Sequence, residues 1–359
     1  MKLYQAFALF GLLFTFTLAK ANQDVASSVE QSPTFTILQY HHVSENTPPV
    51  TSISASQLEK HLAHLAANHN VISLEQGVKA IKEKTKLPDN AVAITFDDGY
   101  ANIYENGFPL LKKYNFPFTI FVNPDTIGTT SSQLSWQQLE EMSSLATYAN
   151  HTIGHIHLLN KQQNETENQW LSRVMNNIIE AENLLNEKLG YSKKWLAYPF
   201  GEFNHKLKQA LLQQGFLGFA QHSGAVGVDT DMGAIPRFPA AGIYANLNTL
   251  KVKLESLPMS VDTYSPFATE QALSDKLNSI EINLKHSRDI RLNQATCYFQ
   301  GNLLATQTEN EQIKVALNHQ FSPGRIRINC TAPSEHLNGR FFWYSVPYFT
   351  PNKNGNYPD

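Results

Sequence analysis

The sequence predicts an α/β domain, built as a parallel sheet or a βα barrel, followed by a small all-β sandwich. Between residues 34 and 220, short apolar β-runs alternate with amphipathic segments, which is typical of parallel strands joined by helices. Past about residue 259, short alternating runs are separated by turns such as Ser322-Pro323-Gly324 and Asn338-Gly339. That second pattern is typical of an all-β domain.

The first domain alternates strands with helices in chain order. Strands are expected at residues 34–40, 91–96, 118–122, 195–197 and 216–220. Helices are expected after a capping box at Ser56 and Glu59, and at residues 108–114, 136–142, 165–189 and 207–213. In the second domain, β-runs are expected at residues 279–285, 296–300, 312–317, 325–329 and 340–345. We therefore place the barrel at residues 22–260, a linker at 261–270 and the sandwich at 271–359.

Composition excludes several classes of protein. The 359 residues carry 28 Lys and Arg against 31 Asp and Glu, a formal charge of −3. This balance argues against a strongly basic nucleic-acid binder and against a polybasic membrane-surface protein, and no nucleic-acid-binding motif is present. With 42% hydrophobic and 16% charged residues, the composition is that of a globular protein.

The first 21 residues resemble a signal peptide. Lys2 precedes an uncharged apolar run at residues 6–18, and Ala19-Lys20-Ala21 is a small-x-small cleavage pattern, with the cut expected after Ala21. The run is shorter than the roughly 20 apolar residues of a membrane span. We expect the mature protein to be exported, to the periplasm or the medium.

Both cysteines, Cys297 and Cys330, lie in the predicted all-β domain. In an exported protein an isolated pair of this kind forms a disulfide, and the alternative is two buried free thiols. Neither cysteine belongs to a CxxC, which argues against a zinc pair.

A pair of adjacent carboxylates, Asp97 and Asp98, follows the apolar run at residues 91–96, and Gly99 permits a sharp turn there. Neighbouring side chains of a strand point in opposite directions. One carboxylate is therefore free to bind a cation while the other stays unligated, although Asp-Asp-Gly by itself is also a common turn.

Histidines supply the other candidate ligands. His151 and His155 are four residues apart, so they meet on a helical turn or converge from a loop, and His157 offers an alternative register. Two histidines and one carboxylate form a catalytic metal set that leaves a position open for water. Tyr40-His41-His42-Val43, at the end of the first strand, is weaker, because such histidines are often simply solvated.

The order and spacing of these pieces resemble the polysaccharide deacetylases, the NodB-homology proteins of carbohydrate esterase family 4, over roughly residues 35–245. Residues 95–100 match the TFDDG(Y) motif, residues 151–155 match H-[ST]-x-x-H, and residues 199–201 match the end of R-x-P-[YF]-G. Residues 38–43 are similar to the YHxV start of the branch that includes exported poly-β-1,6-N-acetylglucosamine de-N-acetylases.

The resemblance implies a deformed (β/α)₇ barrel that removes N-acetyl, and sometimes O-acetyl, groups from sugars. It implies that Asp98, His151 and His155 bind a divalent metal: zinc, with cobalt or nickel as alternatives. It also implies that Asp97 is the general base and that His41 is the general acid. No convincing L-x-H motif, the other source of that acid, follows residue 201.

The sequence departs from the family pattern at Ala197, which stands where the motif-three arginine is expected. Arg237 is the candidate substitute. The second histidine comes four residues after the first, whereas the branch often has five, and this keeps His157 as an alternative ligand. The candidates for oxyanion and substrate contacts are Tyr100 through its backbone N–H, Tyr198, Pro199, Phe200 and Arg237.

Two other functions stay open at this point. One is a catalytically silent carbohydrate-binding protein, and the other is a metal-dependent amidase acting on a substrate that is not a sugar. For a deacetylase, the N-acetylglucosamine polymer is also open among poly-β-1,6-N-acetylglucosamine, chitin oligomers and peptidoglycan glycan.

Overall fold

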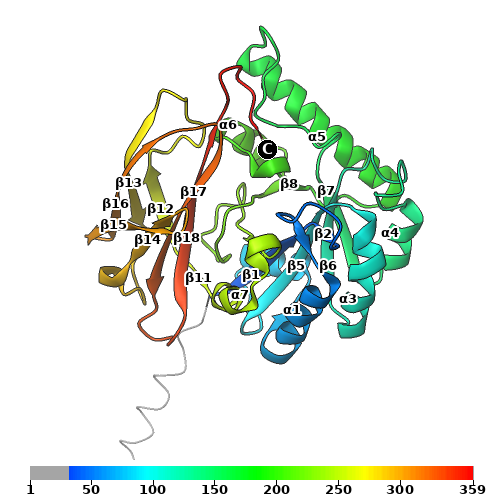
Figure 1. Cartoon of the computed structure of the whole chain (residues 1–359), viewed down its shortest axis with the longest axis horizontal. Helices are drawn as coiled ribbons and strands as arrows, with labels where there is room; N and C mark the ends of the chain where they lie inside the picture. The colour runs from blue at the N-terminus through cyan, green and yellow to red at the C-terminus, as the bar shows by residue number, and fades with distance from the viewer. Residues whose placement is uncertain (1–31, 359) are drawn as a thin grey trace, which may run out of the picture. The chain divides into compact units, whose positions relative to one another are not determined.

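The computed structural model describes residues 32–358, and the chain from Pro33 onward forms one compact unit (Figure 1). The predicted signal peptide lies outside the described residues. Within residues 32–358, no helix combines the length and the apolar character that crossing a membrane requires.

The first part of this unit is the predicted α/β barrel (Figure 1). Its parallel strands are β1 (Phe35–Tyr40), β4 (Asn70–Val71), β5 (Ala91–Asp98), β6 (Phe118–Val122), β7 (Ala146–Asn150), β8 (Trp195–Ala197), β9 (Leu217–Phe219) and β10 (Phe238–Pro239). They are ordered β10-β1-β5-β6-β7-β8-β9, and β4 pairs with β5. A small separate sheet joins β2 (His42–Val43) to β3 (Ser52–Ile53).

Helices connect these strands. They are α1 (Ala55–Asn68), α2 (Leu74–Glu83), the π-helix η1 (Ile103–Gly107), α3 (Phe108–Tyr114), α4 (Trp136–Met142), α5 (Glu167–Leu189), η2 (Pro199–Gly201), α6 (His205–Gln213), η3 (Gly242–Ala245) and α7 (Leu247–Leu254). The predicted capping box at Ser56 and Glu59 is wrong, because α1 is capped two residues earlier by Ser54 with Gln57. Ser54 directly follows strand β3, and the same S-x-x-Q chemistry is therefore available where the chain leaves the strand.

The barrel is closed by a short segment around residue 237. Ile235 bridges to Phe219 of β9, and Phe238 pairs with Leu38 of β1. This segment therefore spans the gap between the two ends of the sheet, and Arg237 lies between its two points of pairing. The closure gives a physical reason for the irregular shape of the barrel: a few bridging residues replace a full strand ladder.

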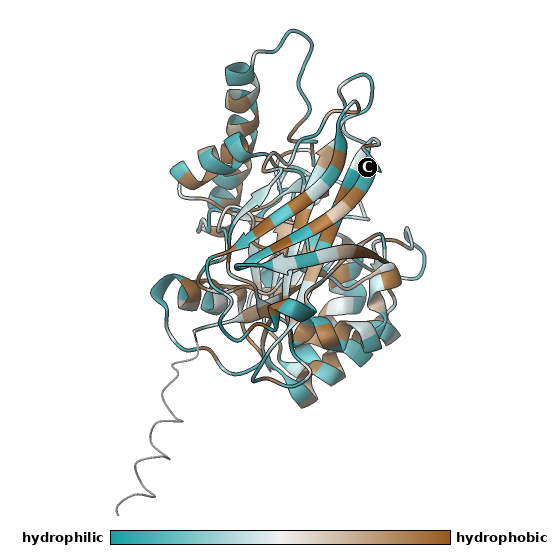
Figure 2. Cartoon of the chain, turned by 90° about the vertical axis from the view of Figure 1, so that its left-hand side faces the viewer, coloured by the Kyte–Doolittle hydropathy of each residue, from teal (hydrophilic) through white to brown (hydrophobic). Residues whose placement is uncertain are grey.

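The second part is the all-β domain. Its strands are β11 (Leu257–Pro258), β12 (Val261–Ser265), β13 (Lys276–Leu284), β14 (Thr296–Phe299), β15 (Asn302–Glu309), β16 (Gln312–Gln320), β17 (Gly324–Pro333) and β18 (Phe341–Thr350), with the 3₁₀ turn η4 (Leu292–Gln294). Strand β15 pairs with β14 through its first residues and with β16 through its last. Strand β15 thus joins two halves of the sheet, β11-β18-β17-β14 and β16-β13-β12. Side chains of both halves share one core, as in a sandwich. Figure 2 shows alternating hydrophilic and hydrophobic residues along the strands of this domain.

The structure differs from the prediction in the segment proposed as a linker, residues 261–270. Its first half is strand β12, which pairs antiparallel with β13. Polar composition suggested a linker, but β12 is an edge strand, and an edge strand presents one side to water.

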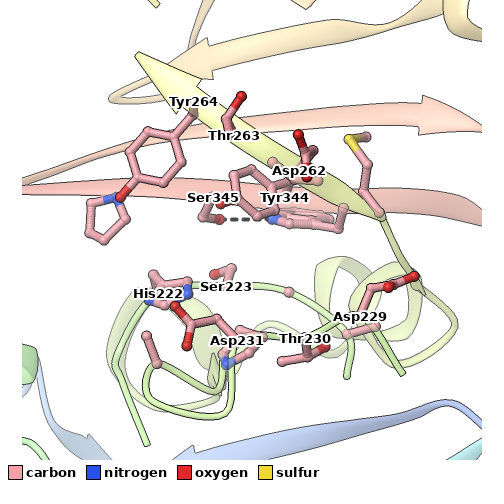
Figure 3. A pocket seen from close by; sticks show the side chains of 18 of the residues that line it. His222, Ser223, Asp229, Thr230, Asp231, Asp262, Thr263, Tyr264, Tyr344 and Ser345 are labelled. Atoms are coloured by element: carbon pink, nitrogen blue, oxygen red, sulfur yellow. Dashed lines mark hydrogen bonds between the residues drawn. The ribbon is translucent and has the colours of Figure 1, made fainter. Parts of the chain in front are cut away.

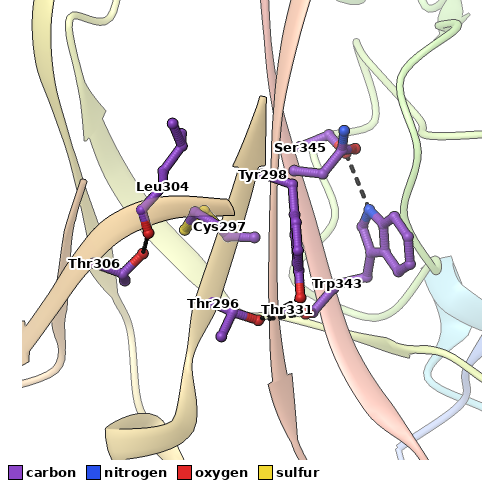
Figure 4. The surroundings of a disulfide bond; sticks show 10 residues. Thr296, Cys297, Tyr298, Leu304, Thr306, Thr331, Trp343 and Ser345 are labelled. Carbon is purple, nitrogen blue, oxygen red and sulfur yellow. Dashed lines mark hydrogen bonds between the residues drawn. A yellow bond between two sulfur atoms is a disulfide. The ribbon is translucent and has the colours of Figure 1, made fainter. Parts of the chain in front are cut away.

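The two cysteines form a disulfide, as predicted. Cys297 on β14 and Cys330 on β17 are direct partners across the two antiparallel strands (Figure 4). Both are fully buried in the sandwich core, whereas their neighbour Tyr298 points to the opposite face.

A cavity of about 150 Å³ lies between the loop around His222 and strands β12 and β18 (Figure 3). The Nδ1 atom of His222 is buried there without a hydrogen-bond partner among the described residues. Burial, followed by the positive charge of Arg327, lowers the pKa of His222 from 6.5 to about 3. The folded protein therefore resists protonation of a side chain that the unfolded chain protonates readily.

This predicts a specific loss of stability in acid. Between pH 6.5 and 3 the unfolded chain binds a proton that the folded chain excludes, so stability is complete above pH 6.5 and falls as the pH decreases. His222→Gln is expected to flatten the decrease between pH 6.5 and 5 by up to about 2 kcal/mol. Urea unfolding at the two pH values measures it, with exposed His336→Gln as the control. Equal slopes in wild type and His222→Gln would contradict the assignment.

Candidate metal centre and active site

The two adjacent carboxylates end strand β5 and point in different directions. Asp97 is fully buried in the barrel interior. Asp98 and Gly99 both have φ of 72°, so the chain turns sharply and carries Asp98 toward the loop after β7. The backbone therefore places the two carboxylates in different environments, as the sequence predicts.

Asp98, His151 and His155 form a group of potential metal ligands whose donor atoms all lie within 4.8 Å of one another. Asp98 Oδ1 is 2.9 Å from His151 Nε2 and 3.4 Å from His155 Nε2. Asp98 Oδ1 and His151 Nε2 are buried, and neither has a hydrogen-bond partner within residues 32–358. Buried polar atoms are rarely left in this state, so the donor set fits a cation.

The orientation of His151 supports the same conclusion. Its Nδ1 lies 2.8 Å from the carbonyl oxygen of Ala197, an atom that only accepts hydrogen bonds. Nδ1 therefore carries the proton, which leaves the Nε2 lone pair directed at Asp98 and available to a metal. Ala197 lacks the arginine of the family motif, yet its backbone orients a ligand.

The two histidines converge from a loop and not from a helical turn. Thr152 and His155 have φ of 71° and 46°. The Asn123 side chain donates hydrogen bonds to the carbonyl oxygens of His151 and Thr152, and Asn150 Oδ1 accepts one from the Thr152 N–H. These side-chain bonds hold a backbone conformation that non-glycine residues rarely adopt.

Charge at the ligand cluster is balanced locally. Burial acts to raise the pKa of the Asp98 carboxyl, but contacts with His151 and His155 hold it well below its ordinary value. Burial likewise opposes a charge on His151, while Asp98 and Asp97 raise its pKa. Without a cation, a proton on the His151 imidazole thus balances the carboxylate.

Asp97 is held by two side chains from distant parts of the chain. Arg237 donates two parallel hydrogen bonds to it, Nη1 to Oδ1 at 2.7 Å and Nη2 to Oδ2 at 2.8 Å, and both side chains are fully buried. Gln39 Nε2 donates a third bond to Oδ2 at 2.7 Å. Burial acts to raise the pKa of Asp97, but Arg237 and the nearby imidazoles lower it, so the carboxyl is ionised near neutral pH.

The sequence interpretation missed Gln39. The signal was a long polar side chain next to the last residue of a strand that is otherwise mostly apolar. A buried strand tolerates such a residue only where it has a partner, and Gln39 is 2% exposed.

His41 lies on the other side of Asp97. Its Nε2 is 3.9 Å from Asp97 Oδ2, and its side chain is 17% exposed. Burial lowers the pKa of His41, while the carboxylates of Asp98 and Asp97 act in the opposite direction. His41 therefore lies near the buried carboxylate and also lines a groove at the surface of the barrel.

Two residues predicted to contact the substrate, Tyr198 and Pro199, are buried. Tyr198 is a core residue and not a substrate contact: it is fully buried, and its hydroxyl donates to the carbonyl of Gly233. The following Pro199 is buried as well. The apolar surroundings of β8 enclose Tyr198, a result that a motif match alone does not reveal.

Other candidates remain at the site. The ring of Phe200 contacts the His155 ring edge-on and stacks on the ring of His157 at 3.8 Å. His157 interacts with the carboxylate of Glu202 and lies outside the group of potential ligands. Tyr100 stacks on His42 at 3.6 Å beside Asp98.

Known proteins resemble this chain in sequence. Residues 84–218 match the family described as polysaccharide deacetylase. The poly-β-1,6-N-acetyl-D-glucosamine N-deacetylase of Staphylococcus epidermidis is 30% identical over 242 residues, which cover 61% of this chain and 83% of that protein.

Solved structures agree on the fold of the barrel. The Streptococcus pyogenes deacetylase PplD, in complex with acetate, superposes with a TM-score of 0.55 at 20% identity, covering 61% of this chain and 98% of that one. A de-N-acetylase from Aggregatibacter actinomycetemcomitans gives a TM-score of 0.55 at 23% identity, covering 61% and 99%. From the family match and the relative in Staphylococcus epidermidis, this chain belongs to the polysaccharide deacetylases.

Proposed function

We propose that this chain is a metal-dependent hydrolase that removes N-acetyl groups from a polysaccharide or oligosaccharide containing N-acetylglucosamine. The observation that carries the proposal is that two neighbouring carboxylates have different partners. Asp98 faces two histidines. Asp97 accepts hydrogen bonds from Arg237 and Gln39. The name of the Staphylococcus epidermidis relative supports the choice of substrate.

Asp98, His151 and His155 are the residues that would hold the cation. When bound, a divalent ion polarises a carbonyl oxygen and lowers the pKa of water from 15.7 to about 7. Two imidazoles and a carboxylate suit zinc, and also cobalt or nickel.

Asp97 is proposed as the general base. It is ionised near neutral pH, and its three hydrogen bonds from Arg237 and Gln39 fix its orientation. A carboxylate held in this way accepts a proton from the attacking water without first reorganising.

His41 is proposed as the general acid. The amine released from an acetamide is a poor leaving group as an anion, so the nitrogen must be protonated as its bond to the carbonyl carbon breaks. His41 lies 3.9 Å from Asp97 and beside the open groove. The backbone N–H of Tyr100 is proposed to donate to the developing oxyanion.

Export is part of the proposal. A signal peptide at residues 1–21 would deliver the chain to a compartment in which the Cys297–Cys330 disulfide is stable. We also propose a domain boundary near residue 260, with β12 assigned to the sandwich.

Acetate release tests the function. The full mature chain is expected to release acetate from β-1,6-linked N-acetylglucosamine oligomers after reconstitution with zinc, cobalt or nickel, and to lose at least about 100-fold of this rate after chelation. Chitin oligomers and peptidoglycan fragments complete the panel. No acetate from any sugar with any metal would favour a silent binding protein. Turnover of simple acetamides alone would favour an amidase.

A further inference from the structure

A row of polar side chains on strand β17 faces the barrel. Successive side chains of a strand alternate between its faces. Ile326, Ile328 and Cys330 therefore enter the sandwich core, and the residues between them, Arg325, Arg327 and Asn329, point the other way. The all-β domain thus presents two arginines to the barrel.

These arginines line the same groove as the proposed general acid. A groove of about 1010 Å³ is bordered by Gln39 and His41 at the barrel and by Arg325 and Arg327 on β17. A second groove of about 690 Å³ shares both arginines and continues along the sheet. Because the two grooves share lining residues, we treat them as one site and call it the β17 groove.

The β17 groove carries an excess of positive charge. Arg325, Arg327 and Lys253 line it, against one carboxylate, that of Glu45. This contrasts with the formal charge of −3 on the whole chain. An acidic protein with a cationic groove beside its active site attracts anions to that groove.

The partners of the guanidiniums are neutral. Arg325 Nη1 donates to the carbonyl of Phe200 and, at 2.8 Å, to Gln221 Oε1, and Arg327 Nη1 donates to the Gln221 carbonyl at 2.6 Å. No ion pair found among residues 32–358 involves either arginine; burial and the neighbouring Arg327 lower the pKa of Arg325, and the carboxylate of Glu202 partly opposes this. These bonds fix each guanidinium through one nitrogen to neutral acceptors, and its other N–H donors remain for a ligand.

A third cation completes the cluster. Lys253 Nζ lies 4.9 Å from the centre of the Tyr244 ring, and both residues line the groove. Burial, together with the charge of Arg327, lowers the pKa of Lys253 to about 8. Like charges gathered without a counterion repel one another, and a bound anion relieves that repulsion.

Aromatic side chains in the same groove favour a sugar as the carrier of the anion. Tyr244, Tyr298 and Trp343 line it, and Figure 4 shows Tyr298 on the face of β14 opposite the disulfide. Tyr298 is 36% exposed. Amphipathic rings beside charged donors suit a ligand with both apolar ring faces and anionic groups.

We propose that the β17 groove binds anionic groups, carboxylate or phosphate, on sugars that flank the N-acetylglucosamine undergoing deacetylation. The inference rests on the proposed function and goes further, because it assigns the substrate to the anionic glycans and gives the all-β domain a role in recognition. Arginine forks match both anions bidentately.

The test compares anionic and neutral substrates. We would measure kcat and KM for acetate release by the full metal-loaded chain. The substrates are a neutral N-acetylglucosamine tetramer, a hyaluronan tetramer carrying carboxylates, and an N-acetylglucosamine tetramer carrying a 6-phosphate. The variants are Arg325→Gln/Arg327→Gln and Arg325→Lys/Arg327→Lys, with Lys276→Gln, an exposed lysine on β13 outside the groove, as the control. The readout is the ratio of kcat/KM for anionic over neutral substrate, so differences in linkage cancel between variants.

The double glutamine variant is expected to lower this ratio about tenfold or more, through KM, and Lys276→Gln to retain it. The lysine variant keeps the positive charges but loses the bidentate forks, so its ratio should fall between the two. Added NaCl should raise KM for the anionic tetramers only. The carboxylate and phosphate arms identify the preferred anion. A ratio unchanged in the glutamine variant, or an equal loss on all substrates, would overturn the inference and leave the arginines as domain contacts.

Calorimetric binding of the anionic tetramers separates this inference from the proposed function. Suppose that the wild type binds the anionic tetramers, that the glutamine variant does not, and that the chain releases no acetate. This result would support anion binding in the β17 groove and refute the proposed hydrolase function. Acetate release from the neutral tetramer, without preferential binding of either anionic tetramer, would do the reverse.

Discussion

Asp97→Asn is expected to reduce acetate release by about 100- to 10,000-fold while the metal content stays unchanged. Asparagine keeps the size of the side chain and an acceptor for Arg237, but it cannot take a proton from water. The ligand atoms of Asp98, His151 and His155 are separate from Asp97, so the cation should remain. Steady-state kinetics and elemental analysis of the purified protein measure the two quantities.

The matched comparison is His151→Ala, which removes a buried ligand and is expected to lose both metal and turnover. The two variants therefore separate proton transfer from metal binding. An Asp97→Asn enzyme close to the wild-type rate would remove Asp97 from the role of general base, and metal retained in His151→Ala would show that the ion binds elsewhere.

Arg237→Met is expected to destabilise the protein by about 3–5 kcal/mol, because it leaves the buried Asp97 carboxylate without its counterion. Turnover should fall as well, since the base loses two of its three hydrogen bonds. Without the guanidinium, the pKa of Asp97 rises, so the acid limb of the pH–rate profile should move to higher pH. Urea unfolding and the pH dependence of kcat/KM measure these effects.

The sign of the pH effect on stability follows from the same ion pair. Arg237 helps hold the pKa of Asp97 below its ordinary value, so the stabilisation is complete above about pH 4 and is lost as the pH falls through the depressed pKa. The double variant Arg237→Met/Asp97→Asn also removes the buried carboxylate that has lost its counterion, and it should recover much of the lost stability.

A surface ion pair provides the control for Arg237. Lys314 contacts Glu281 at 2.7 Å with 51% of its side chain exposed, and Lys314→Met should cost no more than about 1 kcal/mol. Should Arg237→Met fold and turn over like the wild type, Arg237 does not support the base.

Local patterns were sufficient to predict the ligand cluster. TFDDG ends a strand and HTIGH follows another, and parallel strands bring their carboxyl ends to one edge of the barrel. The disulfide was predictable for a similar reason, because the two cysteines of the chain both lie in the all-β domain and have only each other. His157 was left open as a ligand because spacing cannot tell which imidazoles a loop directs inward.

Other features depended on contacts that no local pattern encodes. Arg237 meets Asp97 across 140 residues because the segment from Ile235 to Phe238 closes the barrel. Gln39 joins them from the first strand. Tyr198 was a candidate substrate contact because it directly precedes the Pro199–Gly201 motif, yet packing around β8 buries it.

The sequence by itself determined the alternation of strands and helices, the change to an all-β domain, the cysteine pair and the residues that form the candidate metal site. Each of these follows from short-range periodicity or from motifs at strand ends. Only the tertiary structure showed that the candidate Arg237 holds Asp97 and that two arginines of β17 border the groove beside His41. The physical reason is that barrel closure and domain packing fix these contacts, and both depend on the burial of many side chains at once.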